Sequence, residues 1–213
     1  MNLGSLWLVS LAVLFVGSVH ACEEIRGRGL NYYDPDNLPK LCQGRPSCDF
    51  SERGIGLHLT KSMLKLEKGA TGSIAGDLDF MFHYWPNHPL ALDLASRLVM
   101  LQKKQPRKFG VLDQKVDCYF LQAIQLFPQQ GATFMVYGIH LHREGRYQEA
   151  IDKYLQAESL GIDSAEFHYN LGLAYLKAEA FEKANLQARL AYAKDYPLPW
   201  LQDQLIKAGH WKN

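Results

Sequence analysis

The sequence predicts an all-α protein built as a helical solenoid, and three observations lead to this fold class. The chain has 213 residues, 47% of them hydrophobic and 21% charged, which is the composition of an ordinary globular protein. In its second half, apolar residues recur with the spacing of amphipathic helices joined by tight turns. Residues of similar type also recur 34 positions apart (172 − 138), as expected for repeats that stack on their neighbours.

Residues 1–21 contain no Asp, Glu, Lys or Arg and include the apolar run Leu6–Val16. An apolar core of roughly 11 residues is short for a membrane-spanning helix. Small residues follow it up to Ala21, so we predict a secretory signal peptide over 1–21, with an uncleaved anchor as the alternative. The stretch Val19-His20-Ala21-Cys22 also resembles a bacterial lipobox, in which Cys22 would carry a lipid that holds the protein on a membrane.

Residues 22–72 are rich in glycine and proline, which favours irregular structure. Helical spacing appears only in Thr60–Lys68, where Thr60 can cap a short helix that Gly69 stops. We therefore expect an irregular N-terminal segment that packs on the first helices of the solenoid.

Four cysteines follow the predicted leader, and export would place them in an oxidising compartment where disulfides form. Three pairings are possible. Cys42 and Cys48 flank a Gly-Arg-Pro turn, so a local bridge between them is sterically easy, and Cys22 would then pair with Cys118.

Residues 73–197 form the predicted solenoid. Ser73–Tyr84 ends at a Trp-Pro-Asn sequence and is interpreted as half a repeat. Leu90–Lys103 and Asp117–Phe127 form a first, degenerate repeat with an insertion at residues 102–113.

Two regular repeats and a cap follow. The predicted helix pairs are Thr133–Arg143 with Tyr147–Leu160, and Ala165–Lys177, with Ser164 as its N-cap, with Phe181–Lys194. Residues 198–213 hold a short capping helix, Pro199–Ala208, with Gly209 as the residue that ends it.

The positions that share the 34-residue register are small or aromatic. Two helices in close antiparallel contact need Gly or Ala where their axes approach, while aromatic rings fill the wider gaps between repeats. These predicted contact positions are Gly138, Tyr147, Ala150, Ala157, Gly172, Phe181, Ala184 and Ala191.

This pattern resembles the tetratricopeptide repeat (TPR) family. The resemblance implies a right-handed solenoid of about three repeats, in which the first helix of each repeat lines a concave groove that binds a peptide or helix of another protein. Carried over residue by residue, the groove positions are Met135, Ile139, His142, Arg143, Glu166, Tyr169, Asn170, Leu173 and Lys177. The leader, the sequence from Gly69 to Asp79 and the closing Ala-Gly-His-Trp together also resemble a group of small exported bacterial repeat proteins.

Charge and motifs exclude several function classes. The formal net charge is +1, so no overall field favours nucleic acid, and a charged partner must be recognised by a local patch. The basic cluster Lys103, Lys104, Arg107 and Lys108 is such a patch, either solvated or attracted to an anionic partner. The sequence has no GxSxG, P-loop, HExxH or Rossmann pattern, so we expect neither catalysis nor a cofactor.

The best candidate for a metal site is Asp79 with His83, four residues apart on one helix face, with Asp77 and His88 nearby. A packing role for these residues is the alternative that we favour. The sequence as a whole predicts a non-enzymatic interaction module in the periplasm of a bacterial envelope, whose partner is another envelope protein. A lipid-anchored assembly factor, with Cys22 as the only membrane attachment, and a metal-binding protein remain as alternatives.

Overall fold

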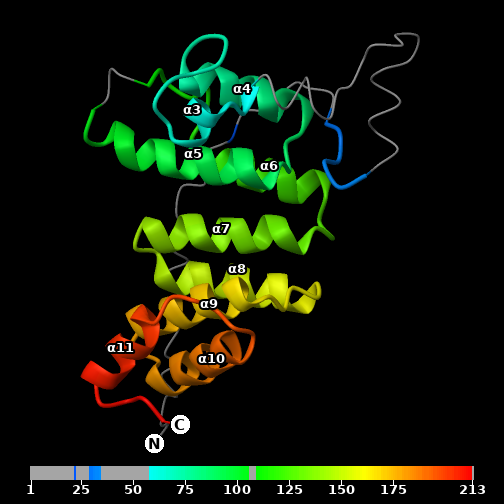
Figure 1. The fold of residues 1–213 in the computed structure, drawn as a ribbon. Helices are drawn as coiled ribbons and strands as arrows, with labels where there is room; N and C mark the ends of the chain where they lie inside the picture. Colours follow the sequence, from blue (N-terminus) through cyan, green and yellow to red (C-terminus); the bar gives the residue numbers. More distant parts are fainter. Residues whose placement is uncertain (1–21, 23–28, 35–57, 106–108, 213) are drawn as a thin grey trace, which may run out of the picture.

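The computed structural model describes residues 22, 29–34, 58–105 and 109–212, and all regular structure within these ranges is helical. Figure 1 shows the helices stacked in successive layers from α4 at one end to α11 at the other. The predicted leader at residues 1–21 and the cysteines Cys42 and Cys48 lie outside the described residues.

In the described part of the chain, helices α3 and α4 precede the first full pair. Helix α3 spans Lys61–Leu64 and is capped by Thr60, whose hydroxyl accepts from the backbone N–H of Met63. It is shorter than the predicted Thr60–Lys68, because the chain turns at Leu66, where φ is 56°. Helix α4 spans Ile74–Tyr84 and is capped by Ser73 in the same way.

Helices α5, Pro89–Gln102, and α6, Val116–Leu126, form the predicted degenerate repeat. Proline occupies the first turn of α5, where its missing N–H costs no hydrogen bond. The predicted insertion between the two helices folds back on α4, since Ala75 N donates to Phe109 O at 3.1 Å.

The regular repeats have the predicted elements, with differences of a residue or two at some ends. Helix α7 pairs with α8, α9 pairs with α10, and α11 packs on both α9 and α10. Their bounds are Gly131–Arg143 (α7), Tyr147–Ser159 (α8), Ala165–Lys177 (α9), Phe181–Ala193 (α10) and Trp200–Lys207 (α11). The predicted fold class, paired helices in a TPR-like arrangement, is confirmed.

The turns repeat as faithfully as the helices. Gly145, with φ of 79°, ends α7, and Glu179, 34 residues later (179 − 145), ends α9 with φ of 57°. Gly161 (φ 86°) and Asp195 (φ 60°) are related in the same way after α8 and α10. Each turn therefore needs a left-handed backbone, which glycine adopts freely and Glu or Asp only at a cost.

Small residues lie where the helices approach most closely. A Cβ at Gly138 would come within 2.7 Å of the Tyr154 ring, and one at Gly172 within 2.6 Å of Leu201. The register alanines Ala150, Ala157, Ala184 and Ala191 are fully buried. Among the described residues, no helix is long and apolar enough to cross a membrane.

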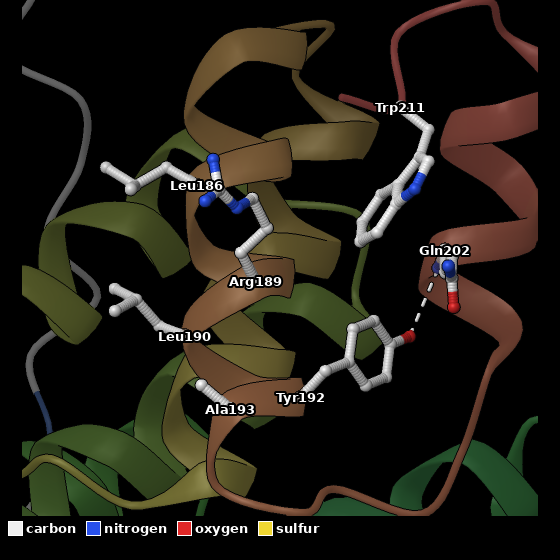
Figure 2. A pocket seen from close by; sticks show the side chains of 7 residues that line it. All are labelled: Leu186, Arg189, Leu190, Tyr192, Ala193, Gln202 and Trp211. Atoms are coloured by element: carbon white, nitrogen blue, oxygen red, sulfur yellow. Dashed lines mark hydrogen bonds between the residues drawn. The ribbon is translucent and has the colours of Figure 1, made fainter. Parts of the chain in front are cut away.

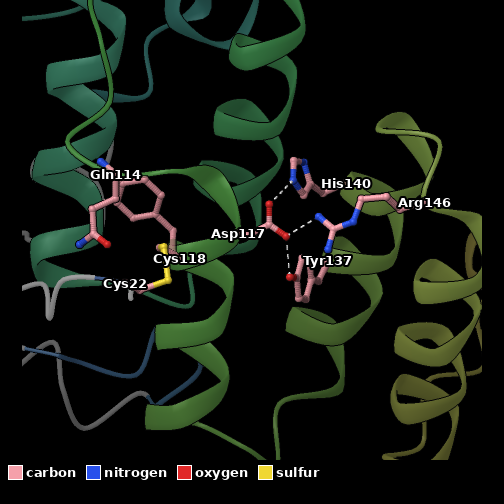
Figure 3. The surroundings of a disulfide bond; sticks show 8 residues. Cys22, Gln114, Asp117, Cys118, Tyr137, His140 and Arg146 are labelled. Carbon is pink, nitrogen blue, oxygen red and sulfur yellow. Dashed lines mark hydrogen bonds and ion pairs between the residues drawn. A yellow bond between two sulfur atoms is a disulfide. The ribbon is translucent and has the colours of Figure 1, made fainter. Parts of the chain in front are cut away.

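Cys22 and Leu30, in the N-terminal segment, are fastened to α6 and α4. Cys22 forms a disulfide with Cys118, a pairing that the sequence predicted, and the two Cα atoms are 5.4 Å apart (Figure 3). Further along, Leu30 N donates to Tyr84 O at 2.9 Å. Because the Cys22 sulfur is bonded to Cys118, it has no free valence for the thioether of a lipid, and the alternative of a lipid anchor on Cys22 is incompatible with this bond.

Candidate partner-binding groove

The first helices of successive repeats lie side by side. Helix α7 contacts both α5 and α9, so side chains from these three helices share one face of the solenoid. Of the residues expected to line the groove, Glu166 and Lys177 are exposed, and most of the others are half-buried.

Three apolar residues form the base of this face. Met135, Ile139 and Leu173 are partly buried and pack against the hydrophobic core, while their remaining surface stays accessible. Because these side chains are already held by the core, they lose little conformational entropy when a partner packs on their exposed apolar surface.

Tyr169 differs from the expectation of an open groove contact. It is only 5% exposed, and its ring stacks on that of Tyr196 with centroids 4.1 Å apart. Its aromatic face is therefore covered by the chain itself, and Tyr169 contributes to the core of the third repeat.

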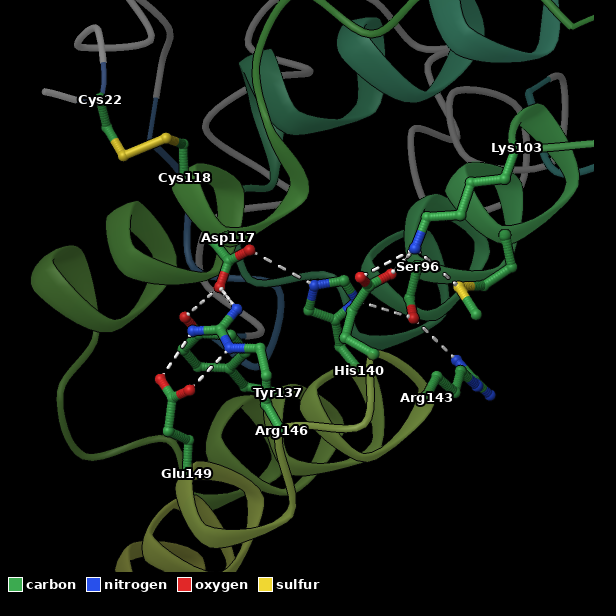
Figure 4. A network of polar contacts seen from close by, with 12 residues as sticks. Cys22, Ser96, Lys103, Asp117, Cys118, Tyr137, His140, Arg143, Arg146 and Glu149 are labelled. Carbon is green, nitrogen blue, oxygen red and sulfur yellow. Dashed lines mark hydrogen bonds and ion pairs between the residues drawn. A yellow bond between two sulfur atoms is a disulfide. The ribbon is translucent and has the colours of Figure 1, made fainter. Parts of the chain in front are cut away.

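Arg143 is held in place by the preceding repeat. Its Nη1 lies 2.7 Å from Asp93 Oδ1 and donates to Ser96 Oγ at 3.0 Å, so the guanidinium spans from α7 to α5 (Figure 4). Such contacts from a neighbouring helix orient the cation before any ligand arrives, which lowers the entropic cost of binding.

His142 lies beside Arg143 at the end of α7. Burial, together with the positive charges of Lys177 and Arg143, lowers the pKa of His142 below its ordinary value. The ring is therefore neutral at pH 7, and its Nδ1 is buried with no hydrogen-bond partner among the described residues. The ends of α7 and α9 thus carry two cations and one unsatisfied imidazole nitrogen.

Asn170 is tied to its own helix. Its side-chain Nδ2 donates to the backbone carbonyl of Glu166 at 2.9 Å. This bond leaves the amide oxygen and the second N–H of Asn170 for another contact.

A polar network between repeats escaped the sequence analysis. The Asp117 carboxylate of α6 accepts from the Tyr137 hydroxyl and from Arg146 Nη1, each at 2.7 Å (Figures 3 and 4). His140, expected from the sequence to be an independent surface or interface group, is 2% exposed, with Nδ1 3.0 Å from Ser96 Oγ and Nε2 3.6 Å from Asp117 Oδ2.

Burial alone would raise the pKa of the Asp117 carboxyl, but neighbouring His140 and the hydrogen bonds from Tyr137 and Arg146 outweigh it and hold the pKa below its usual range. Asp117 is therefore ionised at neutral pH, and its carboxylate joins α6, α7 and the turn before α8. Its partners are 20 and 29 residues away in sequence, so no local pattern signals the network.

The residues proposed as metal ligands are committed to protein donors. Asp79 accepts from the Tyr119 hydroxyl and faces the backbone N–H of Asp113. Asp77 is buried and accepts from the backbone N–H of Ala70 at 2.5 Å.

His83 packs edge-on against Tyr84, and His88 caps α5. Within the described part of the chain, no three His, Cys, Asp or Glu side chains come together as a metal site. The metal alternative at Asp79 and His83 therefore has no support in the structure.

The basic cluster is only partly described. Lys103 Nζ lies 2.9 Å from Glu144 Oε2 and so joins α5 to the end of α7, while Arg107 and Lys108 lie outside the described residues.

Comparison with known proteins agrees with the helix geometry. Residues 140–178 match the family model described as the TPR repeat. This stretch runs from the last turn of α7 through α8 and α9. No curated protein and no solved structure matches the chain. The chain thus contains a TPR repeat at residues 140–178, a module that usually serves as a non-catalytic scaffold for protein partners.

Proposed function

We propose that the protein is a non-enzymatic scaffold that binds a peptide or helix of another protein on the face lined by α5, α7 and α9. The observation that carries this proposal is the grouping of His142, Arg143 and Lys177 at the ends of α7 and α9, beside an apolar base. An apolar surface with a few fixed polar groups is the usual composition of a site that recognises a peptide.

The arrangement favours a partner segment with both apolar and acidic side chains. Met135, Ile139 and Leu173 would bury the apolar side chains, while Arg143 and Lys177 would pair with a carboxylate.

The proposed setting is the envelope of a bacterium, reached by export and cleavage after Ala21. The Cys22–Cys118 disulfide supports this setting, because such bonds persist in oxidising compartments. Cell fractionation and intact mass of the mature protein test it. A mature chain that begins at Cys22 in the periplasmic fraction is expected, and an uncleaved, reduced cytoplasmic protein would contradict it.

The binding function is tested by affinity capture from the native envelope with the tagged, full-length chain. We expect Arg143→Ala and Lys177→Ala to release the captured partner, because both cations lie on the proposed face. Lys207→Ala, which removes an exposed cation of α11, is the matched control. Capture that survives both groove substitutions and their combination would refute this assignment of the binding face.

A further inference from the structure

The segment that follows α11 lies on the surface of α10. Residues 209–212, called the tail below, come after the end of α11. The backbone N–H groups of His210 and Trp211 both donate to Leu205 O, at 2.8 and 3.1 Å, and these two bonds fix the direction in which the tail leaves the helix.

The side-chain amide of Asn185 on α10 holds the backbone of the tail. Its Oδ1 accepts from the backbone N–H of Lys212 at 3.0 Å, and its Nδ2 donates to the carbonyl oxygen of the same residue at 3.3 Å. Asn185 is only 7% exposed, whereas Lys212 is exposed. Because these bonds engage only the backbone of Lys212, a peptide with another side chain at this place can make them too.

Aromatic rings of α10 hold the tail on either side of Asn185. The His210 ring stacks on Phe181 with the centroids 4.0 Å apart, and Trp211 packs edge-on against Tyr192 with the centroids 6.2 Å apart. Phe181 lies four residues before Asn185 (185 − 181) and Tyr192 lies seven after it (192 − 185), which is the spacing of one helix face. This face of α10 thus presents two rings with a buried amide between them.

The preceding repeat does not have this arrangement. The counterparts of Asn185 and Tyr192 one repeat earlier (185 − 34 and 192 − 34) are Ile151, which is buried, and Glu158, which is exposed. Two of the positions through which α10 contacts the tail therefore differ in chemistry from those of α8. The face is not a copy of the packing between ordinary repeats.

The tail is not enclosed by the solenoid. His210 and Trp211 are only half-buried, and Trp211 forms one wall of a groove of about 460 Å³ that Tyr192 and Gln202 also line (Figure 2). Hydrogen bonds and ring contacts of this kind are individually weak, so they hold a peptide reversibly.

We propose that Phe181, Asn185 and Tyr192 form a binding site for an extended peptide, which the tail occupies as an intramolecular ligand. The ligand class is a segment of a partner protein with two adjacent ring side chains, followed by a residue whose backbone pairs with Asn185. Such a segment must displace the tail, which competes at a high effective concentration because it belongs to the same chain. The site lies on α10, so the proposal does not depend on the face lined by α5, α7 and α9.

The test uses the full chain and the sequence of the tail as a probe. The probe is a terminally blocked, fluorescein-labelled peptide with the sequence of residues 208–213, and fluorescence anisotropy measures its affinity. Trp211→Ala with Lys212→Pro weakens docking of the tail, because it removes the indole and the N–H that donates to Asn185. We expect the probe to bind this tail-weakened chain at least about tenfold more tightly than the parent protein, since the competing ligand is lost.

Variants of the site are introduced into the tail-weakened chain. Asn185→Ala removes both amide bonds, and Phe181→Leu removes the ring but keeps an apolar side chain. We expect each to weaken probe binding about fivefold or more. Asn170→Ala on α9 is the matched control and should leave binding unchanged, because its amide bonds to its own helix. Circular dichroism melting verifies that each variant is folded.

Amide chemical shifts of the ¹⁵N-labelled, tail-weakened chain locate the probe. Shift changes centred on Asn185 and Tyr192 would support the proposal. Absence of binding at millimolar peptide, equal affinity for the parent and the tail-weakened chain, or binding that both site variants leave intact would each overturn it. Shift changes confined to α7 and α9 would place the peptide on the other face, and the proposal would then be wrong.

Discussion

The aromatic ring of Tyr154 lies directly over the backbone of Gly138, so close that an added Cβ would come within 2.7 Å of it. This contact joins α7 to α8, and it explains why the register requires a residue without a side chain in the middle of a helix. A glycine inside a helix lowers the stability of that helix. Burial of the Tyr154 ring offsets this cost, because it removes apolar surface from water.

We therefore expect Gly138→Ala to destabilise the fold by about 1–3 kcal/mol, because the clash outweighs the gain in helix propensity. Thermal and urea denaturation measure the change. Gly72→Ala is the control, since a Cβ there meets nothing within 4 Å. Equal stability of the two variants would contradict the close approach.

Ala184 is fully buried on α10, on the side that faces α9. Ala184→Arg forces both volume and charge into this contact, and we expect a loss of more than about 2 kcal/mol in the free energy of unfolding. Ala178→Arg, at an exposed residue after α9, should leave the melting point nearly unchanged. An unchanged melting point for Ala184→Arg would refute the repeat register.

Glu179 ends α9 with φ of 57°, in the place that Gly145 has after α7. We expect Glu179→Gly to stabilise the protein by about 0.5–1 kcal/mol, because glycine relieves the left-handed strain. Gly145→Ala should have the opposite sign at the equivalent turn. Urea denaturation of both variants is the measurement, and a destabilised Glu179→Gly would show that the Glu179 side chain has a role that the backbone does not reveal.

His88 gives the protein a specific sensitivity to acid. It is buried and caps α5, with Nδ1 accepting from Ala91 N, and burial lowers its pKa from 6.5 to about 4. Since the unfolded chain binds this proton more tightly, stability is complete above about pH 6.5 and falls as the pH drops toward 4. The loss is on the order of 3 kcal/mol by pH 4, at about 1.4 kcal/mol per pKa unit.

His88→Asn separates capping from titration, because asparagine also caps helices and does not ionise. Denaturation midpoints between pH 7 and pH 4 should fall less steeply for the variant than for the parent protein. Parallel pH profiles would show that the acid sensitivity comes from other groups. Asp77 and Asp117, whose pKa values lie below their ordinary range, lose their contribution only at lower pH.

The disulfide links positions that are 96 residues apart, so it restricts the unfolded chain strongly. We expect Cys22→Ser with Cys118→Ser to cost about 2–5 kcal/mol of stability. Reductant should lower the melting point of the parent protein more than that of the double variant, which keeps only the expected Cys42–Cys48 bridge. Non-reducing peptide mapping checks the pairing directly, and a peptide that joins Cys22 to Cys42 would contradict it.

Local patterns were sufficient for the helices of this protein. Amphipathic spacing, capping residues such as Ser164 and the recurrence of small residues at Gly138 and Gly172 are all legible along the chain, because helices and tight turns depend on neighbours within a few residues. The same reasoning predicted the Cys22–Cys118 disulfide, because a local bridge between Cys42 and Cys48 leaves only these two cysteines to pair with each other.

Only the tertiary structure decided which residues far apart in sequence are in contact. The Asp117 network, the cover over Tyr169 and the commitment of Asp79 to Tyr119 depend on which faces meet, and no short-range pattern encodes that. The docking of the tail on Asn185 is of the same kind. Asn185 looks like an ordinary helical residue in the sequence, and only the stacking of the repeats shows that its amide is buried and holds another segment, because burial is a property of the assembled solenoid.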